Sequence, residues 1–418
     1  MSKNINSILL KHFTEGRGAA SYIRNKLPEI NIILNNLFTT RSEIHRVQIS
    51  EDLAEKILSL TDFLDLIPLR SEIATFEIKR LISYKKQTDH TVHTVYLFLL
   101  GILIYDNLPD IRTMLDEHIN SSKPVKMFIF QWTFASLLHD VGYLFYEYHG
   151  SKNIFNDMFE FEFIQDYAGE LTPLSRTSLQ EIISKFFNQY PNNNIHEAAT
   201  TLELLQNLNT IPWLEFLGYQ TTLGLEVLAS DKKMERDINE FAFQMATSGY
   251  DGDPVADHGI IGGLMLLKYS SFWYFICEKA SKEYPLLWIE LTTKFKYLIP
   301  ILEKHIIPAC RAVAYHNMSG VKFDFKEEPL LYFSVLCDEI QTWDRFFSGS
   351  EYINNWRTVE HCMAEQVTAE LIISGTGENK ISLITTAAIY TKITSALQKR
   401  LNNWERFVNI SSFENSAV

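Results

Sequence analysis

Residues 126–148 read KMFIFQWTFASLLHDVGYLFYEY, a long apolar run that carries one adjacent His-Asp pair. Upstream, residues 91–106 read TVHTVYLFLLGILIYD and are almost as apolar. Both stretches lack the regular polar positions of a half-exposed helix, so we expect two buried helices at the centre of an all-α fold. The most apolar segment, Val95 to Tyr105, is much shorter than the ~20 residues of a membrane span, which favours a core helix.

The pattern changes on both sides of this centre. Apolar residues spaced by three and four positions predict a helical N-terminal extension over residues 1–85. A domain spanning 86–345 is expected to follow, interrupted at about 150–256 by a more polar insertion that caps or shapes a pocket. Residues 346–418 are expected to form a small C-terminal α+β region.

Finer expectations concern the insertion and the C-terminal region. Helix-like pieces run from Leu179 to Phe187 and from His196 to Leu208. The short apolar runs Gln366 to Ser374 and Ile381 to Thr386 are separated by turn residues and predict a hairpin. A last helix is expected from Ala387 to Val408.

The composition is that of a folded globular protein, with 46% hydrophobic and 21% charged residues in 418. A formal net charge of −13 argues against a general nucleic-acid coat, because such a surface needs a basic face. The apolar run Ile8 to Leu10 is too short for a signal segment, and the four cysteines show no CxxC spacing. We therefore expect a cytoplasmic protein with no membrane partner, and homo-oligomerisation stays open.

Histidines recur inside the apolar segments, where an unpaired polar side chain is costly. His139 and Asp140 are adjacent in LLHDVGY; on a helix they would point about 100° apart and could converge on one metal ion. Further candidates stand in similar surroundings: His93, His258, His316 and Asp338. Mixed His and Asp ligands suit Mn, Fe, Co, Ni or Zn better than Ca.

Structural explanations compete with metal binding at these positions. His139 and Asp140 could form a buried hydrogen-bonded pair in a helix. His258 could simply follow Asp257, the expected helix cap, and His316 at a helix C-terminus would be stabilised by the helix dipole. The order and context of the whole set favour metal ligation.

The ordered series His93, His139-Asp140, His258, His316 and Asp338 resembles that of the HD-domain metal-dependent phosphohydrolases, an all-helical superfamily. The strings DHTVHTVYLFLLG, SLLHDVGY, ADHGIIGG and LCDEIQTWD also resemble a bacterial subgroup of these proteins. The resemblance covers roughly residues 90–345. It implies one metal held by His93, His139, Asp140 and Asp338. It implies a second metal completed by His258 and His316, with Asp140 bridging the two ions and serving as the catalytic carboxylate.

The activity that the resemblance implies is divalent-metal phosphohydrolysis, in which a metal-bound hydroxide attacks a phosphoester of a nucleotide or cyclic (di)nucleotide. The implied cofactors are divalent metal ions, two per chain, as Mn or Fe or as Mg, Co, Ni or Zn. One alternative is a deoxynucleoside triphosphate hydrolase or 5′-nucleotidase with a single metal. Another is a non-catalytic HD module that binds a nucleotide and signals. A nuclease is disfavoured by the acidic charge.

The residues expected to meet the substrate are less well defined. Many HD enzymes carry Lys three residues after the HD aspartate, where this chain has Tyr143. Phosphate charge would then be met elsewhere, and the substrate-binding candidates are His90, Tyr143, Lys268, Arg311 and Arg345.

A glycine cluster and the residues beside Arg345 are given structural roles. Gly259, Gly262 and Gly263 follow no strand and so predict close helix packing rather than a dinucleotide site. Asp344 is expected to form a structural ion pair or to support a ligand.

Overall fold

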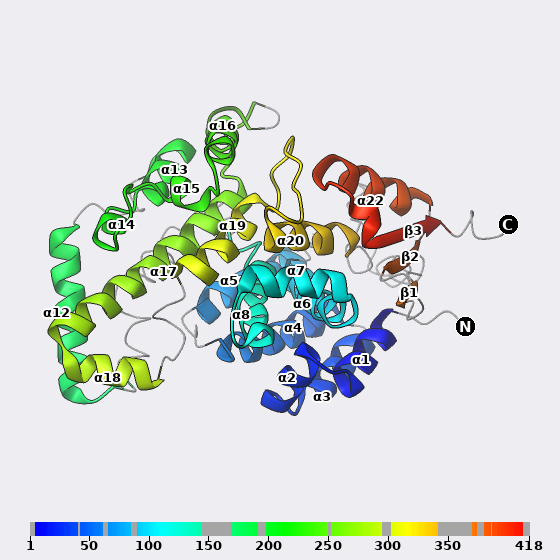
Figure 1. Ribbon diagram of the computed structural model, residues 1–418, viewed down its shortest axis with the longest axis horizontal. Helices are drawn as coiled ribbons and strands as arrows, with labels where there is room; N and C mark the ends of the chain where they lie inside the picture. The colour runs from blue at the N-terminus through cyan, green and yellow to red at the C-terminus, as the bar shows by residue number, and fades with distance from the viewer. Residues whose placement is uncertain are drawn as a thin grey trace. The chain divides into compact units, whose positions relative to one another are not determined.

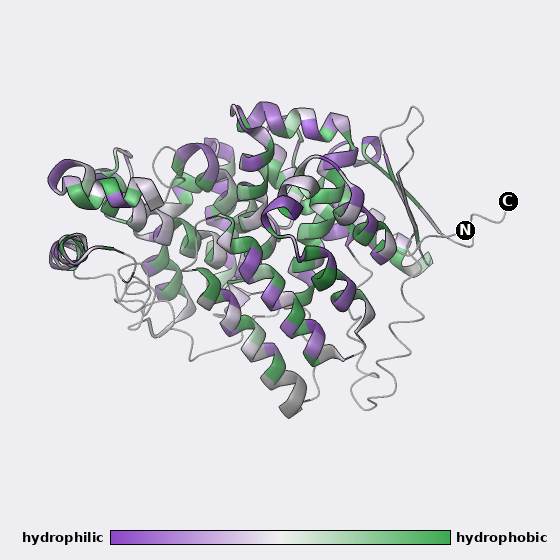
Figure 2. Cartoon of the chain, turned by 90° about the horizontal axis from the view of Figure 1, so that it is seen from below, coloured by the Kyte–Doolittle hydropathy of each residue, from purple (hydrophilic) through white to green (hydrophobic). Residues whose placement is uncertain are grey.

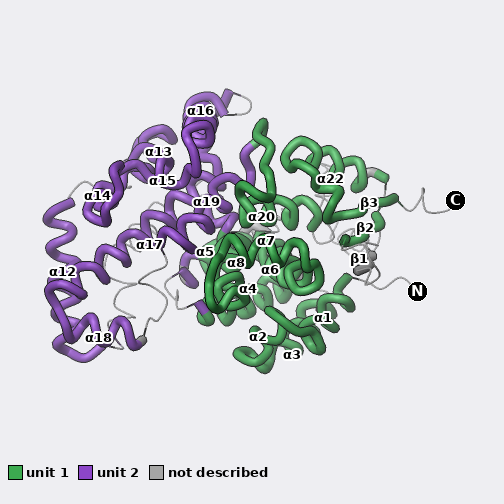
Figure 3. Tube along the Cα trace, viewed as in Figure 1, with its two compact units in different colours: residues 1–60, 70–138, 319–418 green, residues 61–69, 139–318 purple. Residues whose placement is uncertain are grey.

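The computed structural model of the chain describes residues 5–40, 42–61, 66–84, 90–143, 169, 171–190, 198–249, 252–294, 302–341, 370–373, 380–385 and 387–412. The chain divides into two compact units (Figure 3). Unit 1 consists of Met1–Leu60, Arg70–Leu138 and Ser319–Val418, and unit 2 of Thr61–Leu69 and His139–Met318. The stretch 86–345, expected as one domain, therefore contributes residues to both units.

Unit 1 begins with the helical extension that the sequence predicts (Figure 1): α1 (Ile5–Glu15), α2 (Ala19–Lys26), α3 (Ile30–Thr39) and α4 (Glu43–Ser59). The helices of the chain carry both hydrophobic and hydrophilic residues (Figure 2), and the aliphatic rows of these four are buried. The Asp106 carboxylate accepts hydrogen bonds from the backbone N–H groups of Ala19 and Ala20, at 2.7 and 2.9 Å. It thereby satisfies free donors at the start of α2 and complements the helix dipole there.

The core of unit 1 is built from α6 (His90–Asn107), α7 (Pro109–Ile119), α8 (Pro124–Leu137) and α20 (Pro329–Ile340). Every residue of α6 from Thr91 to Tyr105 is buried, which confirms a core helix. The indole of Trp132 donates to the Phe98 carbonyl at 3.0 Å. A Cβ at Gly101 would lie 2.2 Å from the Trp132 ring, so only glycine allows this close approach.

The C-terminal part of unit 1 is the expected small α+β region. Strand β1 (Glu370–Ile373) pairs antiparallel with β2 (Ile381–Thr385), which confirms the hairpin. The expected last helix is wrong beyond Arg400, because α22 covers Ala387–Arg400 and strand β3 (Val408–Ser412) follows it. Helix α22 ends at Arg400, and Asn403, in a left-handed conformation (φ 54°) that asparagine tolerates, precedes the short 3₁₀ helix η4 (Trp404–Arg406). β3 pairs parallel with β2, and α22 supplies the crossover that a parallel pair needs.

The regular elements described in unit 2 are helices, apart from an isolated β-bridge between Thr210 and Leu223. The helices are α12 (Pro173–Gln189), α13 (Thr201–Asn209), α14 (Trp213–Phe216), α15 (Gly224–Leu228), α16 (Lys232–Ser248), α17 (His258–Glu283), α18 (Pro285–Lys294), the π-helix η2 (Leu302–Ile306) and α19 (Ile307–Tyr315). The helix expected from His196 begins at Thr201, because Thr200 and Glu203 form a capping box. Residue 196 itself lies outside the described residues.

Helix α17 is the central element of unit 2. Among the described helices it alone is long and apolar enough by itself to cross a membrane, but its most apolar window is entirely buried in the protein. Helix α5 (Leu66–Tyr84) starts with residues assigned to unit 2 and continues into unit 1.

The α17 glycines allow close packing against α19, as the sequence predicts. A Cβ at Gly263 would lie 2.6 Å from the Ala314 Cβ and 2.8 Å from the Cys310 carbonyl oxygen. A Cβ at Gly259 would lie 3.0 Å from the Val313 carbonyl oxygen. The two helices therefore approach closely enough that backbone atoms of α19 meet the face of α17.

We expect Gly263→Ala to lower the free energy of unfolding by about 1–3 kcal/mol, because the added methyl forces two packed helices apart. Urea unfolding followed by circular dichroism measures this. Gly169→Ala is the matched control, since a Cβ there meets nothing within 4 Å. Equal free energies of unfolding for the two variants would show that α17 and α19 can move apart to accept the methyl group without loss of stability.

Candidate metal centre

The His-Asp pair lies in a turn and not on a helix. The helix expected through residues 126–148 is wrong at this point: α8 ends at Leu137, and His139 and Asp140 stand in the turn that follows. A Cβ at Gly142 would lie 1.9 Å from the His258 carbonyl oxygen, so this glycine lets the turn pass against the start of α17. The turn closes with a hydrogen bond from the Tyr143 backbone N–H to the Asp140 carbonyl, at 3.0 Å.

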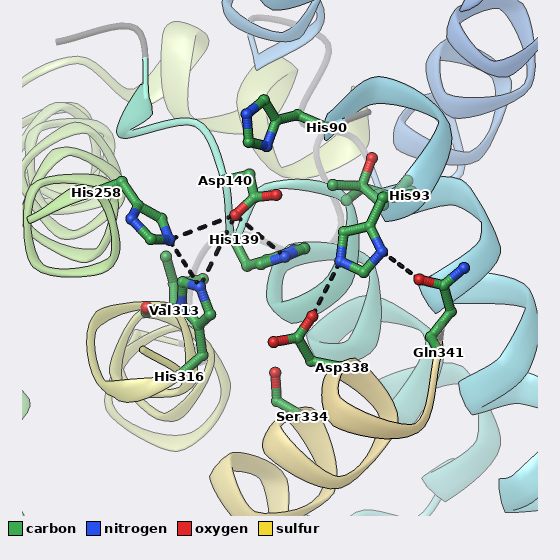
Figure 4. A network of polar contacts seen from close by, with 12 residues as sticks. His90, His93, His139, Asp140, His258, Val313, His316, Ser334, Asp338 and Gln341 are labelled. Carbon is green, nitrogen blue, oxygen red and sulfur yellow. Dashed lines mark hydrogen bonds and ion pairs between the residues drawn. The ribbon is translucent and has the colours of Figure 1, made fainter. Parts of the chain in front are cut away.

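Three histidines of unit 2 point at one carboxylate oxygen (Figure 4). The Nε2 atoms of His139, His258 and His316 lie 3.2, 3.6 and 3.8 Å from Asp140 Oδ1. All four residues are buried, with exposed fractions of 9% or less. Asp140, His258 and His316 meet the geometric requirement for holding one metal ion. The structure thus brings together four of the expected ligands.

Helix ends place two of these histidines. His258 is the first residue of α17, where Asp257 caps the helix by accepting from the Ile260 N–H at 3.0 Å, as expected. His316 is the C-cap of α19. The other Asp257 oxygen accepts from the Asn317 side-chain amide at 3.0 Å, which ties the start of α17 to the end of α19.

The hydrogen bonds of His316 determine which of its nitrogens faces the centre. Its Nδ1 donates to the Val313 carbonyl at 2.7 Å, so a neutral ring presents the Nε2 lone pair. That Nε2 lies 3.1 Å from the Nε2 of His258. A shared proton or a cation makes this contact between two ring nitrogens favourable. Metal-bound histidines commonly use their second ring nitrogen in this way.

Tyr143 stacks on His258. The ring centroids are 3.9 Å apart and the planes differ by 14°. Tyr143, which stands where many HD enzymes carry lysine, therefore contacts a candidate ligand directly, and the stack fixes the orientation of the imidazole.

Unit 1 contains the other two expected ligands. His93 on α6 and Asp338 on α20 form a buried pair, with 2.9 Å between Nε2 and Oδ1 (Figure 4). The His93 Nδ1 donates to Gln341 Oε1, so a neutral His93 turns a lone pair toward a carboxylate. A protonated ring or a bound cation relieves that repulsion. Gln341 stands one helical turn after Asp338 in the sequence, and this spacing could have identified it as a neighbour of the site.

Buried charged residues of unit 1 support the helix ends around His93. The Glu77 carboxylate accepts from the backbone N–H groups of His90 and Thr91, at 2.6 and 3.1 Å. The Arg70 guanidinium, 2% exposed, donates to the carbonyls of Thr91 and Leu137. It thus joins the start of α6 to the last residue of α8. Neither residue carries a signal in the sequence, because each lies within an ordinary amphipathic helix.

Two of the remaining substrate-binding candidates, Arg311 and Lys268, donate hydrogen bonds to backbone carbonyls of unit 2. Arg311 Nε donates to the Leu228 carbonyl at 2.5 Å. Lys268, 1% exposed, donates to the carbonyls of Asn207 and Thr210 at 3.0 and 3.2 Å, so its ammonium is committed to backbone oxygens of unit 2. Residues 344 and 345, expected as an ion pair and a phosphate contact, lie outside the described residues.

No protein-family model, curated protein or solved structure matches this chain. The buried His/Asp groups are compatible with an HD-type metal site.

We expect Asp140→Asn to reduce the affinity for Mn²⁺ at least tenfold, because the carboxylate on which the three imidazoles converge loses its charge. Calorimetric titration with Mn²⁺ measures the affinity, and circular dichroism checks that the helices persist. Asp253→Asn, an exposed aspartate of the same unit, is the control. Unchanged Mn²⁺ affinity in Asp140→Asn would exclude this carboxylate as a ligand.

A second prediction concerns Lys268. Burial lowers its pKa from 10.5 to about 7, so the unfolded chain binds more protons than the folded chain between these values. Stability contributed by this residue therefore rises with pH across that window. We expect Lys268→Met to flatten the rise of the unfolding free energy from pH 7 to pH 10, as measured by urea unfolding. The exposed Lys233→Met is the control. Parallel profiles for wild type and Lys268→Met would contradict a neutral buried amine.

Proposed function

We propose that this protein is a divalent-metal-dependent phosphohydrolase that acts on a phosphoester of a nucleotide or cyclic (di)nucleotide. The observation that carries the proposal is the convergence of three imidazole Nε2 atoms on Asp140 Oδ1 in a buried site. Imidazole nitrogens with a carboxylate oxygen are the donor set of catalytic Mn, Fe and Zn sites. The hydrogen bond from His316 Nδ1 to Val313 leaves the donor atom of that ring facing the centre.

A divalent metal, when bound, supplies Lewis acidity that polarises a phosphoryl oxygen and makes water more acidic. The chain's own residues provide the rest of the site. Asp140 balances positive charge with its buried carboxylate, and His139, His258 and His316 surround it. The Tyr143 ring and the link from Asp257 to Asn317 hold His258 and His316 in place.

The number of metals is part of the proposal. The family resemblance implies that Asp140 is shared between two ions, one of them also held by His93, His139 and Asp338. His93 and Asp338 form a closed pair within unit 1 that has the chemistry of a cation site. We propose both as ligands, and the metal content of a His93 variant tests that assignment.

The substrate class rests on the same resemblance. Because the Lys268 amino group donates to two backbone carbonyls, it is not a candidate for binding substrate phosphate. His90, Tyr143 and Arg311 stay the candidates among the described residues, and the rest of the phosphate charge would be balanced at the metal centre.

The test is elemental analysis of the purified protein together with hydrolysis of cyclic dinucleotides, linear dinucleotides and deoxynucleoside triphosphates. We expect near two equivalents of metal per chain and hydrolysis of the dinucleotides. His316→Ala and His93→Ala should each lose about one equivalent and turnover, because each removes one ligand of a metal. His45→Ala, on the exposed surface of α4, should change neither quantity.

Other results would replace the proposal in defined ways. One equivalent of metal, unaffected by His316→Ala, with triphosphate hydrolysis would favour a single-metal nucleotide hydrolase. Tight nucleotide binding without turnover by the metal-loaded protein would favour a signalling module. Failure to bind metal after loading would remove the catalytic assignment altogether.

A further inference from the structure

A separate pocket lies at the far end of α17 from His258. It has a volume of about 330 Å³, within the range of small-molecule sites, ~300–1,000 Å³. Tyr274, Cys277, Glu278 and Ser281 contribute one wall, and their spacing places them on a single face of α17. His258 and Cys277 are 19 residues apart on this helix, which corresponds to ~28 Å, so the pocket is distinct from the metal centre.

Three other segments of unit 2 complete the pocket. Leu217 and Tyr219 follow α14, where Gly218 takes a positive φ of 96° that lets the chain reverse. Trp288 comes from α18, and Leu302 and Glu303 from η2. Aromatic rings thus stand beside two carboxylates, and none of the described lining residues carries a positive charge.

Two polar atoms of the lining residues have no hydrogen-bond partner in the part of the chain that the structure describes. The Tyr219 hydroxyl and Glu278 Oε2 are both buried and unsatisfied, whereas Glu278 Oε1 pairs with the Lys282 ammonium. An unsatisfied buried polar group is costly, so each of the two side chains gains a hydrogen bond if it turns toward a ligand that offers donors. Burial and the nearby Glu303 carboxylate raise the pKa of Tyr219, so its hydroxyl stays neutral.

The lining residues disfavour nucleophilic chemistry by the Cys277 thiol, and they disfavour anionic or purely apolar ligands. Burial raises the pKa of Cys277 to about 12, so the thiol stays protonated and serves as apolar wall rather than as a nucleophile. An anion would meet two carboxylates, and the Lys282 ammonium that pairs with Glu278 is not part of the described lining. A neutral apolar molecule would fill the aromatic part and leave the Tyr219 and Glu278 oxygens unpaired.

We propose that this pocket binds a small organic cation: a primary or secondary ammonium group attached to an apolar, preferably aromatic, body. The ammonium would be balanced by the Glu278 and Glu303 carboxylates, and Glu278 Oε2 or the Tyr219 hydroxyl would accept a hydrogen bond from it once that side chain turns toward the pocket. The apolar body would pack against Trp288, Tyr274 and Leu302. Attraction between a cation and aromatic faces adds to this recognition. The proposal is independent of the phosphohydrolase assignment.

Phenethylammonium is a suitable probe, with phenethyl alcohol and phenylacetate as neutral and anionic analogues of similar size. Calorimetry gives the affinities, and fluorine NMR of fluorotryptophan-labelled protein locates the site. The Trp288 resonance is assigned with Trp288→Phe. We expect phenethylammonium to bind, to shift the Trp288 resonance, and to bind more tightly than either analogue.

Variants separate the charge from the shape of the pocket. Glu303→Gln should raise the Kd of phenethylammonium severalfold, because the exposed Glu303 carboxylate is partly screened by water, and Tyr219→Phe should raise it by a similar factor. Glu240→Gln, an exposed glutamate of α16 outside the lining, should leave the Kd unchanged. Both pocket variants keep the shape of the residue, and their thermal unfolding shows whether they are folded.

Three results would overturn the proposal. They are equal affinity for phenethyl alcohol, binding that leaves the Trp288 resonance unmoved, and no binding at millimolar phenethylammonium. We expect Glu303→Gln and Tyr219→Phe to have the same metal content and turnover as the wild-type protein. The test of the pocket and the test of the metal centre can therefore fail separately.

Discussion

Asp140 places a carboxylate, 5% exposed, within 3.8 Å of the Nε2 atoms of three imidazoles. Taking a carboxylate out of water costs several kcal/mol unless positive charge and hydrogen bonds compensate. Neutral imidazoles, one of them with its only proton donated to Val313, supply little of that positive charge. A bound cation supplies it at once, and protonated histidines do so at the cost of mutual repulsion. This electrostatic requirement is the constraint around which unit 2 is arranged.

The backbone around the centre is built to meet that requirement. Rather than one helix presenting several ligands, a turn, a helix start and a helix end each deliver one or two. The close approach at Gly142 and the glycine face of α17 bring the turn, the start of α17 and the end of α19 together. The bridge from Asn317 to Asp257 then fixes the start of α17 against the end of α19. Helix termini hold their first and last side chains less rigidly than helix interiors do, so such cross-links have a clear physical purpose.

The sequence predicted the parts of this arrangement that follow from burial. A histidine or aspartate inside LLHDVGY, AVAYHN or LYFSVLCDE stands out because an apolar segment gives it no solvent, and the structure buries His139, His316 and Asp338 as expected. The glycines of α17 and the C-terminal hairpin were predicted for equally local reasons. The all-α class with a small α+β tail follows from periodicity and is also confirmed.

What the sequence left out depends on contacts between distant segments. The turn at His139 looks helical because the apolar run continues through it, and only the neighbouring carbonyl of His258 shows why Gly142 is needed. The sequence does not predict strand β3, of which only Val408 falls within the expected last helix, because its parallel partner β2 precedes α22 in the chain. Arg70, Glu77 and Asn317 look like surface residues of amphipathic segments until their buried partners are known. The pocket is assembled from four segments, so no single stretch carries its signal.

Helix α17 is subject to two different constraints, one at each end. Its first turns carry His258 and three glycines, where an added Cβ would meet α19 or the turn that contains His139 and Asp140. Its last turns carry Tyr274, Cys277, Glu278 and Ser281, which line open space. The same buried helix is therefore constrained by close backbone contact at one end and by the chemistry of its side chains at the other. Substitutions in the first half should act through geometry, whereas those in the second half should act through charge and hydrogen bonding. This difference in kind follows from the packing of a single helix, and the resemblance of the HD motif alone would not have indicated it.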